Sequence, residues 1–585
     1  MAAVAFLVTV AVFAPSARYE FVDYDDRLYV IENEHMREGL TVGNAAWAFA
    51  SRGYADNWHP LTWISLQADV SALRTWERFT GKPGDEKWGV WDFERGTGDR
   101  WFTRLSRVMH FHNVLLHAAN AALLFLLAVL FARRAGKEES EELRVKSEEF
   151  DGVSLIPHPS SLIPLFLSLL WALHPLRVEA VCWVAERKEV LSCFFMLITL
   201  IIYCGAERSP RPTKWWIVSF ITYAAAVASK PVAVTLPAVI VAWDWIFRGR
   251  IRWARIVPFA AFAFLSCLFT MQSQGAAMDA GSEITTVSRL SMIFVSPLVY
   301  IRQTFWPLDL AILYETTTQI NLFALLGGIA LHILCLSIGV AWVVRRVWSS
   351  QSGGRGATRP TEAQGTRHES LFTLHFSLLT FAVAWLYVGL LPMLGIVKVG
   401  CQEHCDRYTY WVGCGACVVA AMALGRVADA IRRRLNDKDW GDLCRVSCGC
   451  ALALVVALAC LTWRQMGSWK NTVALYRNAM KQSWVPEAAK ILADQLARRD
   501  GKEGVKEGLE ILRDCATKHP CVTANLNLAA YTLMYRMADP FSAQFGGKLY
   551  GEEEFLIREA MSKEPDNERA KKMLELIEAR RKEVK

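Results

Sequence analysis

The stretch NVLLHAANAALLFLLAVLF, residues 113 to 131, decides the class of the fold. It carries no charged residue, and its 19 residues approach the length that an α-helix needs to cross the apolar core of a bilayer. A second run, LFALLGGIALHILCLSIGVAWVV at residues 322 to 344, has the same character. Of the 585 residues 53% are hydrophobic, and 23 are Trp and 29 are Phe. The composition therefore predicts a membrane protein rather than a set of soluble domains.

We predict an all-α polytopic fold with eleven transmembrane helices. The spans lie near residues 1 to 15, 108 to 131, 161 to 173, 190 to 206, 215 to 229, 231 to 247, 256 to 271, 322 to 344, 372 to 394, 408 to 430 and 446 to 463. The first is short, and FAPSA follows it like a small-residue cleavage site, so it is either an anchor or a removed signal.

Charge in the short loops predicts the orientation, because Lys and Arg are retained on the cytoplasmic side. The basic loops are 206 to 214, 248 to 255, 345 to 360 and 432 to 440. All of them fall inside only if the segment at 290 to 307 is re-entrant or interfacial. The net charge of +8 is then explained by these loops, and no nucleic-acid partner is required.

This orientation divides the chain into four parts. They are a first span or signal anchor at 1 to 15, a large non-cytoplasmic first loop at 16 to 107, a multi-span domain at 108 to 464 and a soluble non-cytoplasmic domain at 465 to 585. We expect a multi-pass protein of a bacterial inner membrane, with the first loop and the C-terminal domain in the periplasm.

The C-terminal domain carries amphipathic helices of 12 to 16 residues that are separated by short turns. Ala recurs at helical spacing, which favours about three helical pairs of the tetratricopeptide type. The full repeat consensus is absent, so a generic helical bundle remains the alternative.

The first loop begins with EFVDYDDRLYV, residues 20 to 30, directly after an apolar run. Adjacent carboxylates such as Asp25 and Asp26 point to different sides of a turn, so one is able to accept a proton while the other orients a substrate. His59, in YADNWHPLTW, is a supporting polar group of the same loop. The alternative is a solvated loop whose carboxylates cap a helix.

The segment HPLRVEAVCWVAERKEVLS, residues 174 to 192, joins two spans. If it is helical, Glu179 and Glu186 share one face, while Arg187 and Lys188 lie at the membrane edge. Such cations suit a phosphate that arrives from the lipid side. Snorkelling of the two basic side chains is the alternative.

Two further polar groups are expected at the same face. Lys230 lies in the tight turn SKPV, and Asp406 with Arg407 begins a span in VKVGCQEHCDRYTYW, residues 397 to 411. Pairing of Asp406 with Arg407, which would only anchor the helix, is the alternative reading. Cys401 with Cys405 and Cys515 with Cys521 are possible disulfides, and no metal-ligand spacing is present.

The ordered motifs VDYDDRLYV, NWHPLTW, LHPLRVEAVCWVAERKEVLS, SKPVAVTLP, LPMLGIVKVG, DRYTY and TWRQMGSWKNTVALYRNAM resemble the transmembrane and tetratricopeptide-repeat O-mannosyltransferase family and its bacterial relatives. The resemblance implies an inverting C-type glycosyltransferase that uses a polyprenyl-phosphate sugar, here mannose. Asp25 and Asp26 would be its catalytic pair, and the repeat domain would hold a protein or peptide acceptor. The stretch 75 to 102 and the short repeat region depart from the family pattern.

On electrostatic grounds we assign the donor phosphate to Arg187, Lys188, Lys230 and Arg407, with Glu179, Glu186 and Asp406 as supporting polar groups. The need for a divalent cation, Mg²⁺ or Mn²⁺, is left open. A non-catalytic scaffold that presents repeats to partners is the first competing hypothesis. A transporter is the second, although it would place its charges near the bilayer midplane.

Overall fold

The structure is a computed structural model and describes residues 1–51, 53–56, 58–81, 91–92, 97–98, 100–135, 159–206, 209–273, 286–314, 321–352, 365–394, 404–518, 521–538 and 551–584. Within these ranges the chain is helical, apart from a two-stranded antiparallel ladder between β1 (Trp91–Asp92) and β2 (Thr97–Gly98). The prediction of an all-α membrane protein is confirmed at this level.

Eight helical segments of the described chain are long and apolar enough to cross a bilayer. They are Trp101–Ala132, Val184–Gly205, Pro231–Arg248, Trp253–Gln272, Leu322–Trp348, Phe376–Met393, Asp406–Arg432 and Asp437–Trp469. A bent pair, Leu162–Ala172 with Pro175–Cys182, makes nine if it counts as one span. The predicted number of eleven is therefore not confirmed.

Two of the eleven predicted spans account for the difference between eleven and nine. Helix α1 (Ala2–Phe13) has 12 residues, about 18 Å of helix against a hydrocarbon core of about 30 Å. Helix α8 (Pro212–Ser229) begins with Pro-Thr-Lys-Trp-Trp, which shortens its apolar part. The predicted re-entrant segment at 290 to 307 forms η11 (Ser291–Val295) and α13 (Ser296–Phe305), which are not among the candidate spans.

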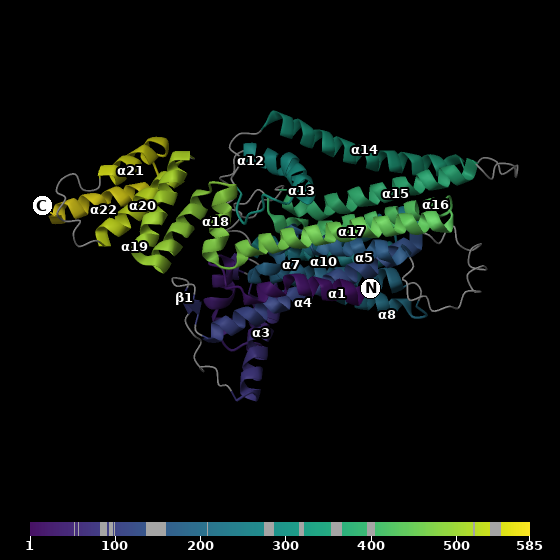
Figure 1. Cartoon of the computed structure of the whole chain (residues 1–585), viewed down its shortest axis with the longest axis horizontal. Coiled ribbons are helices and arrows are strands. Elements are labelled where there is room, and N and C mark those ends of the chain that lie inside the picture. Colours follow the sequence, from purple (N-terminus) through teal and green to yellow (C-terminus); the bar gives the residue numbers. More distant parts are fainter. Residues whose placement is uncertain are drawn as a thin grey trace.

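The membrane helices lie side by side along the longest axis of the molecule (Figure 1). The centre is α4 (Arg100–Ala135), which packs against α1, α5, α7 and α16. The other long helices are α5 (Pro159–Ala172), α7 (Arg187–Gly205), α9 (Leu236–Arg248), α10 (Trp253–Ser273), α14 (Leu322–Ser352), α15 (Gly365–Leu390), α16 (Thr409–Arg432) and α17 (Asp437–Met466).

The chain between α5 and α7 folds back into the protein instead of forming an exposed loop. It passes through η6 (Pro175–Arg177), α6 (Val178–Cys182) and η7 (Val184–Glu186), with a bend of 58° after Ala172. Every residue from 171 to 193 is buried. Charged side chains of this segment must therefore find partners inside the protein, because an unpaired buried charge is costly.

The first loop covers one end of the bundle with short helices: η1 (Ala14–Arg18), η2 (Arg27–Ile31), η3 (Glu34–Met36), α2 (Val42–Ala50), η4 (Tyr54–Asp56) and α3 (Pro60–Phe79). Helix α3 projects from the body of the molecule (Figure 1). Its base is anchored by Trp63, which is fully buried among Tyr29, Trp47 and Tyr54. The aromatic packing fixes the segment that carries Asp25 and Asp26 against α3.

The C-terminal helices extend beyond the same end of the bundle (Figure 1). After η14 (Gly467–Trp469) come α18 (Thr472–Gln482), α19 (Pro486–Lys518), α20 (Val522–Ala538), α21 (Gly551–Lys563) and α22 (Glu568–Val584). Helix α19 is broken at Gly501, where φ is 58°. The break divides α19 into two helical halves, and the repeat-like character of the domain stays a prediction.

Glycine allows the two halves of α19 to approach closely. A Cβ at Gly504 would lie 1.8 Å from the Leu496 carbonyl oxygen, so no larger residue fits there. In the same domain Cys515 and Cys521 are not joined by a disulfide, and Cys401 lies outside the described residues.

Candidate active site

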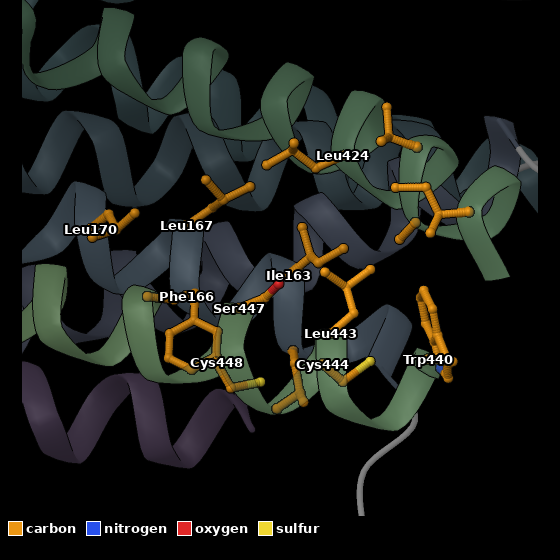
Figure 2. Close-up of a pocket in the computed structure, with 15 residues that line it drawn as sticks. Ile163, Phe166, Leu167, Leu170, Leu424, Trp440, Leu443, Cys444, Ser447 and Cys448 are labelled. Carbon is orange, nitrogen blue, oxygen red and sulfur yellow. The ribbon is translucent and has the colours of Figure 1, made fainter. Parts of the chain in front are cut away.

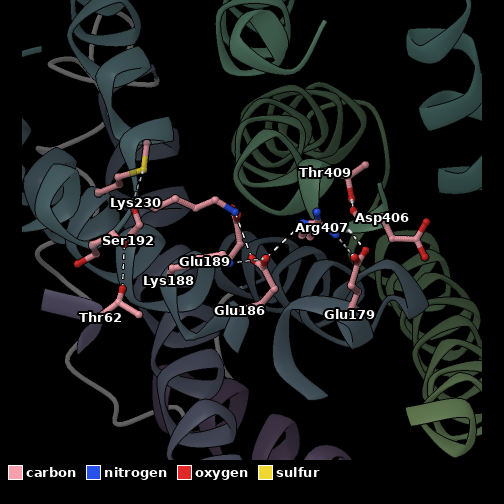
Figure 3. Close-up of polar contacts among 12 residues, drawn as sticks. Thr62, Glu179, Glu186, Lys188, Glu189, Ser192, Lys230, Asp406, Arg407 and Thr409 are labelled. Carbon is pink, nitrogen blue, oxygen red and sulfur yellow. Dashed lines mark hydrogen bonds and ion pairs between the residues drawn. The ribbon is translucent and has the colours of Figure 1, made fainter. Parts of the chain in front are cut away.

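The site is built around the carboxylate of Glu186, which lies between cations from three parts of the chain (Figure 3). Its Oε1 is 3.2 Å from Lys188 Nζ and 3.3 Å from Arg407 Nε, and its Oε2 is 3.1 Å from Lys230 Nζ. Glu189 is a second partner of Lys230, and Glu179 a second partner of Arg407. We call Asp25, Glu179, Glu186, Lys188, Glu189, Lys230 and Arg407 the ion-pair cluster.

Lys230 reaches the cluster because it lies between the end of α8 and Pro231, where the chain leaves the helix. It follows α8 with φ −157° and ψ 134°, and Pro231 begins η9 (Pro231–Thr235). A residue before proline is driven into extended backbone, which turns the chain away from the helix axis. Thr62 Oγ1 donates a hydrogen bond to the carbonyl of Ser229, 2.9 Å away, and holds this turn against α3.

Lys188 connects the cluster to the acidic first loop. Its Nζ donates to Tyr29 Oη at 3.1 Å and lies 3.6 Å from Asp25 Oδ2. The Asp25 side chain is 38% exposed, while that of Lys188 is 9% exposed. Asp25 is therefore the carboxylate of the acidic pair that both touches the cluster and meets the outside.

Asp26 is fully buried and faces away from solvent. Its Oδ1 accepts from the Ala185 amide at 2.8 Å and its Oδ2 from the Val22 amide at 3.1 Å. Burial raises the pKa of the Asp26 carboxyl from 3.8 to about 7, although the two amides act in the opposite direction. Asp26 therefore ties the first loop to η7, where the chain approaches Glu186.

Arg407 lies in η13 (Asp406–Tyr408), the short turn before α16. Its side chain pairs with Glu179 and Glu186, and its amide donates to Glu179 Oε2 at 2.9 Å. Asp406 instead accepts from Tyr314 Oη at 2.6 Å and from Gln303 Nε2 at 3.3 Å. The two neighbours thus anchor different parts of the site, and the alternative of a mutual pair is not what the structure shows.

His59 caps α3 beneath the acidic loop and is 1% exposed. Its ring stacks on Tyr29 with centroids 5.3 Å apart, and neither ring nitrogen has a hydrogen-bond partner in the described chain. Burial and the nearby ammonium groups of Lys188 and Lys230 hold its pKa well below the usual value. His59 is therefore a neutral ring that shapes the floor of the loop.

Arg187 is placed apart from the other predicted phosphate ligands. It is fully buried, and its guanidinium contacts Asn113, Ser65, His112, Asp69 and the Met109 carbonyl. Its Nη2 lies 2.9 Å from Asp69 Oδ2, which joins α7 to α3. Snorkelling is excluded by this burial, and the structure gives Arg187 a packing role rather than a place in the ion-pair cluster.

The C-terminal domain contacts the acidic loop directly. Gln495 Nε2 donates to Asp23 Oδ2 at 2.7 Å, and the Asp23 amide donates to Thr472 Oγ1 at 2.9 Å. The Glu20 amide donates to the carbonyl of Lys470 at 3.0 Å. Helices α18 and α19 therefore border the same loop that presents Asp25.

The cluster contains four carboxylates and three cations, so its cations are all paired internally and one negative charge is in excess. All four carboxylates contact a cation, and Asp25 is the one of the four that is exposed. Among the described residues no group of three or more His, Cys, Asp or Glu is arranged to hold a metal ion.

A cavity of about 360 Å³ lies elsewhere, between α5, α16 and α17 (Figure 2). Its lining is apolar except for Ser447 and the thiols of Cys444 and Cys448. It offers no acid or base for proton transfer, so we do not place the chemistry there.

Several members of the site were not predicted. Glu189 follows Glu186 by three residues, a helical spacing that would have placed both on one face. Tyr29, Tyr314 and Gln495 gave no such signal, because each is defined by a contact with a distant segment.

Comparison with known proteins gives partial similarities. The chain is 26% identical over 155 residues to protein O-mannosyl-transferase TMTC4 of Homo sapiens, a match that covers 25% of this chain and 19% of the relative. It is 27% identical over 152 residues to the protein of the same name from Mus musculus, covering 24% and 18%. The matches thus span about a fifth of the length of these relatives. No protein-family model matches the chain.

Proposed function

We propose that the chain is an integral-membrane glycosyltransferase that moves mannose from a polyprenyl-phosphate donor to a hydroxyl acceptor. The observation that carries the proposal is the 3.6 Å approach of Asp25 to Lys188, next to a buried carboxylate that gathers Lys230 and Arg407. A base and three cations then face one reaction centre. The partial similarity to named O-mannosyl-transferases favours this reaction over others.

Asp25 is the general base of the proposed reaction. A base must come within hydrogen-bond distance of the acceptor hydroxyl, which requires an exposed carboxylate, and Asp25 is exposed where Asp26 is not. The acceptor O–H proton goes to Asp25, and the acceptor oxygen forms a bond to the anomeric carbon. The bond from that carbon to the phosphate oxygen breaks with inversion, and the polyprenyl phosphate leaves with the electron pair.

Lys188, Lys230 and Arg407 stabilise the negative charge that grows on the departing phosphate. Fixed cations in a poorly hydrated site lower the energy of such a transition state. The side chains of Lys188, Lys230 and Arg407 are 9%, 12% and 13% exposed, so each keeps a small area open to a bound phosphate. Glu186 and Glu189 position the ammonium groups, and Glu179 positions the guanidinium.

The C-terminal helices are the proposed acceptor side of the site. They hold the acidic loop through Asp23, two residues before the proposed base. A polypeptide bound to α18 and α19 would therefore present a Ser or Thr hydroxyl close to Asp25. We place this face in the periplasm of a bacterial inner membrane, because the basic loops lie at the other ends of the spans.

The test is transfer of radiolabelled mannose from polyprenyl-phosphate mannose to a Ser/Thr-containing peptide by the purified protein in nanodiscs. The proposal expects labelled peptide from wild type and from Glu34→Gln, a matched change of an exposed carboxylate in the same loop. If wild type transfers no sugar from any polyprenyl-phosphate donor, the enzyme proposal fails. The hypothesis of a non-catalytic scaffold is then favoured.

A further inference from the structure

A second charged cluster lies at the end of the bundle away from the acidic loop. Lys230 precedes α9 at the ion-pair cluster, and Arg248 ends the same helix. The span Pro231–Arg248 contains 18 residues, about 27 Å of helix. We propose that Arg248, Arg252, Arg255 and Arg346, which we call the arginine cluster, bind the phosphate of an anionic phospholipid in the opposite leaflet.

The first part of the cluster is a fixed Arg248. Its Nη1 donates to Asp244 Oδ1 at 2.7 Å, and Tyr203 Oη donates to Asp244 Oδ2 at 2.8 Å. Asp244 is fully buried, so the pair anchors the guanidinium at the end of α9. The same guanidinium lies 5.5 Å from the centroid of the Tyr203 ring.

The second part comes from α14, far along the chain. Gly249 ends α9 with φ 72°, and a Cβ at this position would lie 2.5 Å from Arg346 Nη2. The absence of a side chain therefore admits the Arg346 guanidinium over the turn. Arg346 also lies 5.4 Å from the Trp342 ring, which contacts Trp245 of α9. A loop that only sets the membrane orientation needs basic residues but no fixed geometry. Here side chains from α9 and α14 are held together at one place.

The third part is the start of α10. Arg255 lies over the Trp216 ring of α8, 3.1 Å from its centroid. Arg252 and Arg248 are close enough for their charges to repel that of Arg255, while the Asp244 carboxylate attracts it. Arg252 and Arg255 lie at the start of α10, which is its positive end, and the first turn of this helix holds no acidic residue. Such an arrangement is relieved by an anion.

The charge of the surrounding sequence is strongly positive. Residues 206 to 214, 244 to 255 and 345 to 346 contain nine Lys and Arg and two acidic residues, Glu207 and Asp244. Trp253 and Trp348 are 61% and 75% exposed beside the arginines. Exposed Trp marks the level of lipid headgroups, and basic pockets between transmembrane helices bind anionic headgroups. Charge complementarity at headgroup depth therefore favours a lipid phosphate over a soluble anion.

The experiment measures lipid binding by native mass spectrometry and the melting temperature of the full-length protein. Micelles contain either phosphatidylglycerol or phosphatidylcholine. We expect wild type to retain phosphatidylglycerol and to melt at a higher temperature in its presence. Arg255→Gln and Arg346→Gln are each expected to weaken the binding of phosphatidylglycerol about fivefold. Arg248 is left unchanged because it pairs with the buried Asp244.

The matched control is Arg434→Gln, an exposed arginine near the end of α16. It removes the same charge outside the cluster and is expected to leave binding unchanged. Equal loss in Arg434→Gln and Arg346→Gln, or equal binding of phosphatidylcholine, overturns the proposal. If millimolar inorganic phosphate displaces the lipid, the cluster binds phosphate in general, and the proposal of a lipid ligand is overturned. Should Arg255→Gln not fold, Arg346→Gln carries the comparison alone, and mannose transfer stays independent of either result.

Discussion

Gln495 of α19 donates a 2.7 Å hydrogen bond to Asp23, which precedes Asp25 by two residues in the acidic loop. The two residues are 472 positions apart in the chain. The C-terminal helices thus hold the loop that carries the proposed base. A movement of α19 would therefore move the segment that contains Asp25.

The first prediction concerns this contact. Gln495→Ala removes one hydrogen bond to a carboxylate, worth about 1.5–3 kcal/mol, and lets the loop move. We expect the turnover number for mannose transfer to fall by about tenfold or more, while the Michaelis constant for the donor is unchanged. Gln482→Ala, an exposed change at the end of α18, is the control. A turnover number equal to that of the control contradicts the positional role.

The second prediction concerns Asp26 and pH. Burial raises its pKa from 3.8 to about 7, so the folded protein binds this proton more tightly than the unfolded chain. The corresponding stability is complete below about pH 4 and is lost as pH rises through 7. Burial also raises the pKa of Glu20 and of Asp23, so the wild-type slope has several sources.

The measurement is therefore a difference between proteins. The melting temperature of wild type is expected to fall more steeply from pH 4 to pH 7 than that of Asp26→Asn. The free energy of unfolding of Asp26→Asn is also expected to be about 1–3 kcal/mol lower than that of wild type. The Asn side-chain nitrogen cannot accept the hydrogen bond that one of the Ala185 and Val22 amides donates to Asp26. Parallel curves for the two proteins would show that Asp26 does not titrate in this range.

The third prediction concerns Glu186, the carboxylate shared by three cations. Glu186→Gln leaves Lys188, Lys230 and Arg407 without their common anion in a buried setting. Loss of one partner from a buried ion pair costs about 3–5 kcal/mol, so we expect a large drop in melting temperature. Glu34→Gln removes a carboxylate that is 80% exposed and should have almost no effect. Similar stability of both variants rules out the cluster as described.

The fourth prediction concerns close helix packing in the C-terminal domain. Gly504→Ala places a methyl group against the Leu496 carbonyl, so the pair of half-helices in α19 must separate. We expect destabilisation of about 1–3 kcal/mol, read as earlier proteolysis of the domain. Gly441→Ala in α17 meets nothing within 4 Å and is expected to be neutral or slightly stabilising. Equal protease resistance of the two variants contradicts the packing.

The sequence predicted the parts of the fold that depend on local composition. Apolar runs such as 113 to 131 located the long helices, because length and hydropathy suffice for this. The prediction was less accurate where tertiary contacts decide the structure. The segment 174 to 192 was expected to join two spans, with Arg187 and Lys188 at the membrane edge. Its residues are instead buried and its helices are bent, and it supplies Glu179 and Glu186 to the centre of the cluster.

The site could be predicted in outline but not in its connections. Asp25, Lys188, Lys230 and Arg407 were singled out because charges next to apolar segments are costly without a purpose. Their pairing depends on distances across the fold, which spacing along the chain does not contain. For the same reason Arg187 was grouped with Lys188, although adjacent residues at the start of a helix point in different directions and Arg187 contacts Asp69.

Removal of the acceptor proton by Asp25 is tested by the rate of mannose transfer by purified Asp25→Asn. The variant keeps the size of the side chain and should melt close to wild type, since Asp25 is partly exposed. We predict a turnover number at least about 100-fold below that of wild type, with Glu34→Gln fully active. A folded Asp25→Asn protein that transfers mannose at the wild-type rate would show that Asp25 is not the general base.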